Sequence, residues 1–191
     1  MNAKEYFEQG YGKQVAGLYA EAIKDYNKAL ELDKGFERVY VQRAYCKVQL
    51  KEYESAISDF KLAIELNPND PITYLNLGQT YYNLGVKDDT TDFDKAIELD
   101  ENMFEAHFAR GNALLYKEEY GQAIISLTKA IELEPTWSAF YLCRAIAYQN
   151  MGNYQKALED YNKSKQLNPN DKDIDERIEE CQNELATLNK A

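Results

Sequence analysis

Residue types on which catalysis and cofactor binding depend are scarce in this sequence. Among 191 residues there is one histidine, and the three cysteines, Cys46, Cys143 and Cys181, are odd in number and far apart. This spacing fits neither a disulfide framework nor a zinc site. The sequence also lacks the nucleophile elbow of serine hydrolases, the P-loop of nucleotide-binding proteins and the paired histidines of zinc proteases. We therefore expect no catalytic residue, no metal and no cofactor.

Positive charge is in short supply as well. Lysine and arginine number 22 against 33 aspartate and glutamate residues, which gives a net charge of −11. A nucleic-acid-binding protein neutralises phosphates with clustered basic residues, so we expect no nucleic-acid partner. The chain has no apolar run of about eighteen residues, the length of a membrane span. The first residues, Met1–Tyr6, have no apolar core. These absences predict no membrane insertion, no secretory signal and a cytoplasmic location, where cysteines stay reduced.

What the sequence does contain is a repeat of small side chains. One series consists of Ala29, Ala63, Ala96, Ala130 and Ser164, with steps of 34, 33, 34 and 34 residues. A second series with similar steps consists of Gly10, Ala44, Gly78, Gly111 and Ala145. Apolar residues recur three and four positions apart within each repeat, which predicts two amphipathic helices. The small residues allow these helices to approach closely, and Gly17, Gly85 and Gly152 mark the turns between them.

Two stretches carry the pattern of a known repeat family. They are Tyr74-x-x-Leu77-Gly78-x-x-Tyr81-x-x-x-Gly85 and Tyr154-x-x-Ala157-x-x-x-Tyr161, the second followed by Pro169. With these residues the chain resembles the tetratricopeptide repeat family. The resemblance implies an all-α fold, a right-handed α-solenoid of helical hairpins. The predicted repeats lie at approximately 3–36, 37–70, 71–103, 104–137 and 138–171, and a C-terminal capping helix follows at 172–191.

The last predicted helix carries one apolar stripe on an acidic background. The stripe consists of Ile174, Ile178, Cys181, Leu185 and Leu188. A helix that is apolar inside and polar outside is most simply the cap of a repeat array. The same stripe could also pair with a second copy of the chain in a coiled coil.

The third predicted repeat is one residue short. The deletion lies after Gly85, and the second helix of this repeat lacks an alanine that the others have. Asp89, with Asp92 three residues later, is interpreted as the N-cap of that helix. We expect this hairpin to bury less surface than its neighbours and to open first.

One face of each predicted first helix is free of charge. By resemblance to the family, this face lines a concave groove in which a partner segment binds. The candidate peptide-binding residues are Phe7, Tyr11, Val41, Tyr45, Leu75, Gln79, Tyr82, Asn83, Phe108, Asn112, Tyr116, Leu142 and Gln149. Aromatic side chains would supply affinity and amides would bind the peptide backbone. The alternative for each residue is that it packs against the adjacent repeat.

Three other features have plainer interpretations. His107 stands where most repeats have tyrosine, which predicts a packing residue. Trp137, at the hinge into the fifth repeat, is interpreted as a packing plug and not as a ligand contact. The best-known ligand mode of the family clamps the acidic C-terminus of heat-shock chaperones with lysine, asparagine and arginine. Phe7 and Tyr11 stand at the first two of these places, so the pattern does not support that mode.

Together these patterns predict a non-catalytic scaffold for protein–protein interaction. Its partner would be a protein or peptide, and its groove would take an uncharged or partly apolar segment. The alternative is a self-associating assembly subunit, a possible homodimer formed through the array end or the C-terminal helix.

Overall fold

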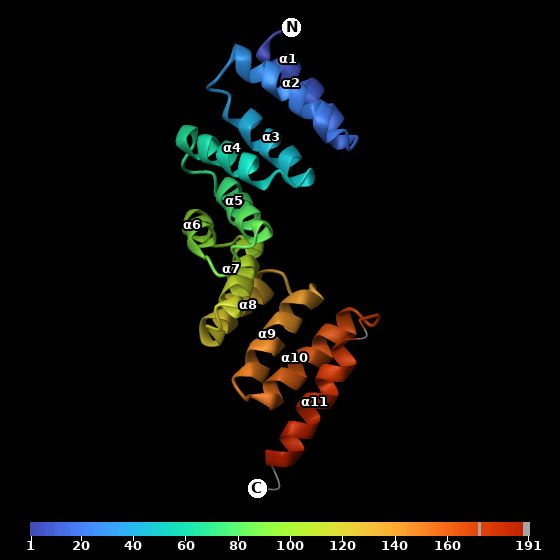
Figure 1. The fold of residues 1–191 in the computed structure, drawn as a ribbon. Coiled ribbons are helices and arrows are strands. Elements are labelled where there is room, and N and C mark those ends of the chain that lie inside the picture. The colour runs from blue at the N-terminus through green and yellow to red at the C-terminus, as the bar shows by residue number, and fades with distance from the viewer. Residues whose placement is uncertain (172, 189–191) are drawn as a thin grey trace. The chain divides into compact units, whose positions relative to one another are not determined.

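The computed structural model describes residues 1–171 and 173–188 of the chain (Figure 1). Eleven helices follow one another in these ranges: α1 (Ala3–Val15), α2 (Tyr19–Leu32), α3 (Glu37–Gln49), α4 (Tyr53–Leu66), α5 (Pro71–Leu84), α6 (Thr91–Leu99), α7 (Phe104–Tyr116), α8 (Tyr120–Leu133), α9 (Ser138–Asn150), α10 (Tyr154–Leu167) and α11 (Asp173–Leu188). The predicted all-α fold class is confirmed, and the right-handed sense of the solenoid stays a prediction. Within the described ranges, no helix is long and apolar enough to cross a bilayer.

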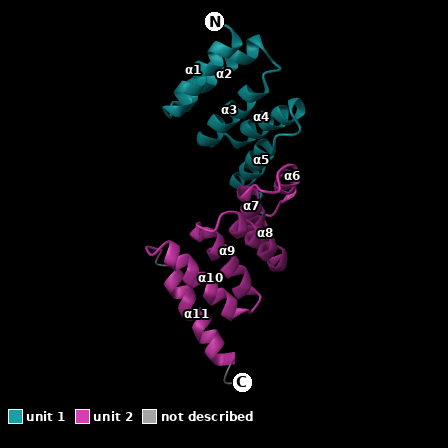
Figure 2. Ribbon diagram, turned by 180° about the vertical axis from the view of Figure 1, so that it is seen from behind, with its two compact units in different colours: residues 1–87 teal, residues 88–191 magenta. Residues whose placement is uncertain are grey.

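The helices belong to two compact units (Figure 2). Unit 1 comprises residues 1–87 with helices α1–α5, and unit 2 comprises residues 88–191 with helices α6–α11. In unit 1, α1 packs on α2 and α3 packs on α4; in unit 2, α7 packs on α8 and α9 packs on α10. The boundary falls in the turn of the predicted third repeat. The repeat boundaries themselves stay a prediction.

Each hairpin turn contains a residue with a left-handed backbone. The φ angle is 76° at Gly17, 110° at Gly85 and 73° at Gly152. Glycine adopts this conformation without the steric penalty of a Cβ atom, so the three predicted turns are confirmed. In the α3–α4 and α7–α8 turns the corresponding residues are Lys51, with φ 62°, and Glu118, with φ 61°. A side chain at these two positions costs backbone strain.

Small residues allow the two helices of a hairpin to cross at short range. A Cβ atom added at Gly10 would lie 2.7 Å from the Tyr26 ring, and one added at Gly111 would lie 2.7 Å from Cγ of Leu127. Because real Cβ contacts are longer, neither crossing has room for a side chain. Other positions of the interior hold fully buried alanines, namely Ala22, Ala29, Ala44, Ala56, Ala63, Ala96, Ala123, Ala130, Ala145 and Ala157.

Three first helices each carry one arginine that bonds to the second helices on either side. Arg43 of α3 donates to both carboxylate oxygens of Asp59 in α4, at 2.8 and 2.6 Å. It also donates to Asn27 of α2 at 2.7 Å. Arg110 of α7 and Arg144 of α9 repeat the arrangement in unit 2. Each partner lies sixteen residues before or after its arginine, so these contacts follow the repeat.

Helix α6 is the shortest second helix, with nine residues where α2, α4, α8 and α10 have fourteen. Its N-cap is Thr90, so the predicted cap at Asp89 is wrong by one residue. Asp89 still accepts a hydrogen bond from the Thr91 N–H at 2.9 Å. This bond lowers the pKa of Asp89, because it favours the charged carboxylate. The Thr90 hydroxyl donates to Asp94 instead of to the helix backbone.

Helix α11 buries part of its apolar stripe within unit 2. Ile174 and Cys181 are fully buried in a cluster with Ala157 and Tyr161. At the far end of the stripe, Leu188 is 58% exposed. Residues 172 and 189–191 of the predicted capping helix lie outside the described residues.

Candidate functional site

The predicted groove residues differ widely in exposure. Those that are exposed are Tyr11, Tyr45, Gln79, Asn83 and Tyr116; those that are half-buried are Val41, Leu75, Tyr82, Phe108, Asn112, Leu142 and Gln149. Phe7 alone among the thirteen is buried. A binding surface built from this set therefore has to be argued from its exposed members and from the cavities they line.

Unit 1 contains a cavity of about 220 Å³ formed by α3, α4 and α5. Its lining residues are Tyr45, Val48, Gln49, Phe60, Asn76, Gln79, Thr80 and Asn83. None of the eight is charged. Tyr45, Gln79 and Asn83 are predicted groove residues, and the fold brings these three together at one place.

The wall of this cavity combines the packed ring of Tyr45 with side-chain amides that form no hydrogen bond within the described residues. Tyr45 is 42% exposed and its ring lies edge-on to that of Tyr19 in α2, with centroids 6.4 Å apart. Within the described residues, the side-chain amides of Gln49, Gln79 and Asn83 make no hydrogen bond. A free amide offers one acceptor and two donors, which suits the backbone of an extended segment.

Phe7 is held in the interior of unit 1. Its ring packs on Tyr26, with centroids 5.9 Å apart, and on Phe36, at 5.2 Å. The guanidinium of Arg38 lies 5.4 Å from the centroid of the Phe7 ring. Tyr11 stacks on Phe7 at 6.3 Å and remains exposed. We therefore leave Phe7 out of the proposed groove.

In unit 2 the predicted groove residues mostly pack. The ring of Phe108 lies 4.8 Å from that of the buried Phe140. Gln149 accepts a hydrogen bond from the hydroxyl of Tyr161 and donates one to Glu180 of α11 at 3.3 Å. Leu142 packs against the buried cluster beneath α11, Asn112 is half-buried and Tyr116 is exposed.

Cys46, Cys143 and His107 occupy packing positions among the described residues. Burial raises the pKa of Cys46 to about 11 and that of Cys143 to about 11, so both thiols stay protonated at neutral pH. His107 is buried, with Nε2 at 3.0 Å from the carbonyl oxygen of Glu101 six residues earlier. Tyr141 donates its hydroxyl hydrogen bond to the carbonyl six residues before it in the same way. His107 therefore fills a tyrosine-like packing position, as predicted.

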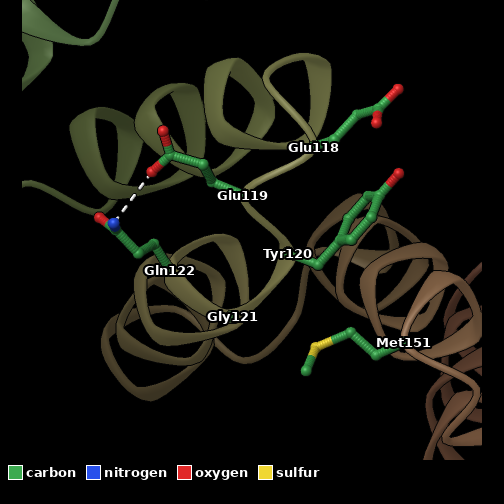
Figure 3. Close-up of a pocket in the computed structure, with 6 residues that line it drawn as sticks. All are labelled: Glu118, Glu119, Tyr120, Gly121, Gln122 and Met151. Atoms are coloured by element: carbon green, nitrogen blue, oxygen red, sulfur yellow. Dashed lines mark hydrogen bonds between the residues drawn. The ribbon is translucent and has the colours of Figure 1, made fainter.

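A larger cavity, of about 400 Å³, lies at the α7–α8 turn of unit 2 and contains no predicted groove residue (Figure 3). It is lined by residues 118–122 and by Met151. Figure 3 shows Glu118 and Tyr120 projecting to the same side, and Glu119 accepting a hydrogen bond from Gln122 at 2.9 Å. Glu119 also pairs with Lys117 at 2.9 Å. These acids are exposed or partnered, and the turn offers no catalytic arrangement.

Sequence reasoning missed the arginine contacts and the glutamine contacts of the interior. Gln14 accepts from the Tyr26 hydroxyl at 2.6 Å and donates to Gln42 of the next first helix at 2.7 Å. Gln149 makes the equivalent bond to Tyr161. A spacing of twelve residues between glutamine and tyrosine recurs in both units and is the signal that could have identified these bonds.

Models of one repeat family match four segments of the chain. A model described as TPR repeat matches residues 44–85, and models described as tetratricopeptide repeat match residues 16–36, 104–137 and 138–171. Together these segments cover more than half of the chain.

Curated relatives match over part of their length. Serine/threonine-protein phosphatase 5 of Rattus norvegicus is 35% identical over 89 residues, which is 47% of this chain and 18% of that protein. Protein STIP1 homolog of Dictyostelium discoideum is 31% identical over 90 residues, which is 47% of this chain and 16% of that protein. The matched part of the chain thus spans less than a fifth of either relative.

Solved structures share the fold over most of the chain. A crystal structure of the MamA protein matches with a TM-score of 0.80 and 21% identity, over 86% of this chain and 91% of that one. YrrB, described as a TPR protein with an unusual peptide-binding site, matches with a TM-score of 0.77 and 24% identity, over 88% of each chain. The chain belongs to the tetratricopeptide repeat family, whose members act as protein-interaction scaffolds and are generally non-catalytic.

Proposed function

We propose that this chain is a non-catalytic scaffold and that the cavity of unit 1 receives an uncharged, partly apolar segment of a protein partner. The observation that carries the proposal is the lining of that cavity: eight uncharged residues in a chain of which 29% of residues are charged. An uncharged wall disfavours an acidic or basic ligand, which would lose hydration without gaining a counter-charge.

The size of the cavity favours a side chain over a small molecule. Its volume of about 220 Å³ is below the roughly 300–1,000 Å³ of typical small-molecule pockets. A single large apolar or aromatic side chain could enter beside Tyr45 and rest on the buried ring of Phe60. The amides of Gln79 and Asn83 would then bind the backbone on either side of this anchor.

Binding by this surface is expected to depend on aromatic burial and hardly on ionic strength. An array of short uncharged peptides, each with one leucine or aromatic residue, would supply the probe. The tightest binder is then titrated against the full chain and its Tyr45→Ala variant. Loss of a central aromatic anchor is expected to cost about 2 kcal/mol, roughly a thirtyfold loss of affinity.

Tyr11→Ala is the matched control: Tyr11 is an exposed tyrosine of unit 1 and a predicted groove residue, but it does not line the cavity, and we leave it out of the proposed site. Its affinity for the peptide should stay close to that of the parent, and raising the salt concentration should change little. An equal loss in both variants, or a steep dependence on salt, would contradict the proposed site.

Self-association through α11 is less favoured than binding of a different protein. A coiled coil would need the whole apolar stripe on its seam, but Ile174 and Cys181 are already buried against Ala157 and Tyr161. Light scattering at micromolar concentration tests the alternative directly. A concentration-dependent dimer that Leu188→Glu abolishes would support self-association through α11.

A further inference from the structure

Arg110 of α7 meets a hydroxyl where the arginines of α3 and α9 meet a carboxylate. Arg43 and Arg144 each donate from Nε and Nη2 to an aspartate sixteen residues later, in the helix that follows. The residue sixteen positions after Arg110 is Ser126, which accepts one hydrogen bond from Nη1 at 2.6 Å. The repeat that contains α7 and α8 therefore does not supply the acid that the other two arginines receive.

The guanidinium of Arg110 is only partly engaged by the chain. Its Nε donates to Asp94 of α6 and its Nη1 to Ser126. Its Nη2 makes no hydrogen bond within the described residues. The Arg110 side chain is 25% exposed, against 16% for Arg43 and 17% for Arg144. Two N–H groups of this arginine are therefore available to a ligand.

Arg110 lines a cavity of about 450 Å³ in unit 2. The cavity is formed by α6, the α6–α7 turn, α7 and α8, and its lining residues are Asp94, Ile97, Glu101, His107, Arg110, Ile125, Ser126 and Lys129. No predicted groove residue is among these eight. The cavity is therefore separate from the groove that the sequence predicts, and it belongs to unit 2 alone.

Lys129 supplies a second cation to this cavity. It is half-buried, lies three residues after Ser126 on α8, and forms no hydrogen bond or ion pair within the described residues. The equivalent cavity of unit 1, of about 430 Å³, is lined by Arg43 and by Leu62, which stand 67 residues before Arg110 and Lys129. Helix α8 thus presents a hydroxyl and a lysine where α4 has an acid and a leucine.

Two acids also line the cavity of unit 2, and they leave these donors unused. Asp94 is bound to Nε of Arg110, and Glu101 forms no ion pair within the described residues. A carboxylate that enters the cavity can therefore accept from Nη2 of Arg110 and from the ammonium of Lys129, and both bonds would be charge-assisted. Because unit 2 is acidic as a whole, a single carboxylate is favoured over a run of acids.

We propose that this cavity binds one aspartate or glutamate side chain of a partner protein, next to an apolar residue. The partner's carboxylate would give Arg110 the acid that the other two arginines receive from within the chain. The apolar neighbour would lie on Ile97 and on Ile125, which is 69% exposed. The proposal does not depend on the cavity of unit 1, which lies in a different unit and has an uncharged wall.

A peptide with a single charge provides the probe. It contains one glutamate followed by one leucine between glycines, with both ends capped. The full chain is titrated with this peptide and with an analogue in which glutamine replaces the glutamate, and the amide NMR shifts of α7 and α8 are followed. We expect saturable shifts with the glutamate peptide and at least tenfold weaker binding of the glutamine analogue. Equal affinities, or no binding of either peptide, would overturn the proposal.

Lys129→Gln removes one of the two donors and should weaken binding of the glutamate peptide about five- to tenfold. Lys163→Gln is the matched control, because Lys163 stands 34 residues later, is exposed on α10 and does not line the cavity. Both variants change the net charge equally, and both should melt like the parent. Equal losses of affinity in the two variants would show that only net charge acts and would refute the assignment.

Ser126→Asp places the missing acid within the chain. The new carboxylate should bind Arg110 as the aspartates of α4 and α10 bind their arginines, and binding of the glutamate peptide should weaken about tenfold or more. A folded Ser126→Asp variant that binds the peptide as tightly as the parent would contradict the site. Lys129→Gln tests the same site at a half-buried position should Ser126→Asp fail to fold.

Discussion

The two units use the same internal contacts but carry different surface charge. In both, a tyrosine of a second helix donates to a glutamine of the first helix, as Tyr26 does to Gln14 and Tyr161 to Gln149. Residues 1–87 carry 11 basic and 12 acidic side chains, whereas residues 88–191 carry 11 and 21. The net charges are therefore −1 and −10, so almost all the acidity of the chain belongs to unit 2.

This difference separates the requirements of the fold from those of binding. The buried contacts recur because each hairpin must pack on the next. Surface charge is free to differ, and it differs most around α6 and α11. Unit 1 has an uncharged cavity at Tyr45, while unit 2 carries 21 of the 33 acidic residues. The two units thus offer a partner chemically different surfaces.

The largest expected effect is a loss of stability: removing a buried acid of unit 1 should cost more than removing an exposed acid of unit 2. Asp59 has a 4% exposed side chain and pairs with Arg43 at 2.6 Å and with Lys47 at 2.7 Å. Asp59→Ala removes the carboxylate that neutralises both cations and should cost about 3–5 kcal/mol of stability. Asp94 pairs with Arg110 but is 47% exposed, so Asp94→Ala should cost less than about 1 kcal/mol. Denaturant melts measure both, and similar losses would contradict this ranking.

The next effect tests whether the helix crossings are equally tight in the two units. Gly10→Ala and Gly111→Ala each place a Cβ atom 2.7 Å from a core side chain and should cost about 1–3 kcal/mol. Gly12 and Gly121 lie in helices with nothing within 4 Å of an added Cβ atom. Alanine at these two controls should stabilise the protein by about 0.5–1 kcal/mol, since it favours the helix. Melts in which all four variants shift alike would show that the crossings are looser than described.

The fold was predictable because its main signal is steric and periodic. A close crossing admits only a small residue, so positions such as Gly10 and Gly111 reveal the repeat directly. The contact between Arg43 and Asp59 is harder to foresee, because it depends on how two helices are rotated about their axes. The sixteen-residue spacing between Arg43 and Asp59 predicts a contact only once the geometry of the hairpin is known.

The candidate site was predictable only in part. Helical spacing correctly groups residues on one face, and Tyr45 and Gln79 do line one cavity. Spacing cannot show what the next helix covers. Phe7 is buried because Phe36 packs on it, and Gln149 is engaged by Tyr161 and Glu180. Trp137, interpreted from the sequence as a packing plug, stacks on the buried Phe140 and is still 52% exposed.

A smaller effect concerns α6, at the start of unit 2. Its buried residues are Phe93 and Ala96, whereas α4 of unit 1 buries five residues and α8 buries four. Fewer buried contacts lower the free energy of local opening, so amides of α6 should exchange about tenfold faster than those of α4 or α8. Hydrogen exchange resolved by residue measures this. Equal protection in the three helices would show that the short helix is no weaker than its counterparts.

The smallest effect asks which of two neighbouring acids at the start of unit 2, Asp88 and Asp89, stabilises the fold. Asp89 accepts a hydrogen bond from the Thr91 N–H, and Asp89→Ala should cost about 1 kcal/mol at neutral pH, as loss of one hydrogen bond does. The folded-state pKa of Asp89 is lowered, so its contribution is present above the unfolded pKa and is lost as pH falls through the folded one. The difference between parent and variant should therefore shrink in acid. Asp88→Ala, at an exposed neighbour, should change stability by less than about 0.5 kcal/mol at any pH. Thermal melts at neutral and acidic pH compare the two. If Asp88 proves as costly to remove as Asp89, both acids stabilise the start of α6; if only Asp89 matters, the hydrogen bond to Thr91 accounts for the effect.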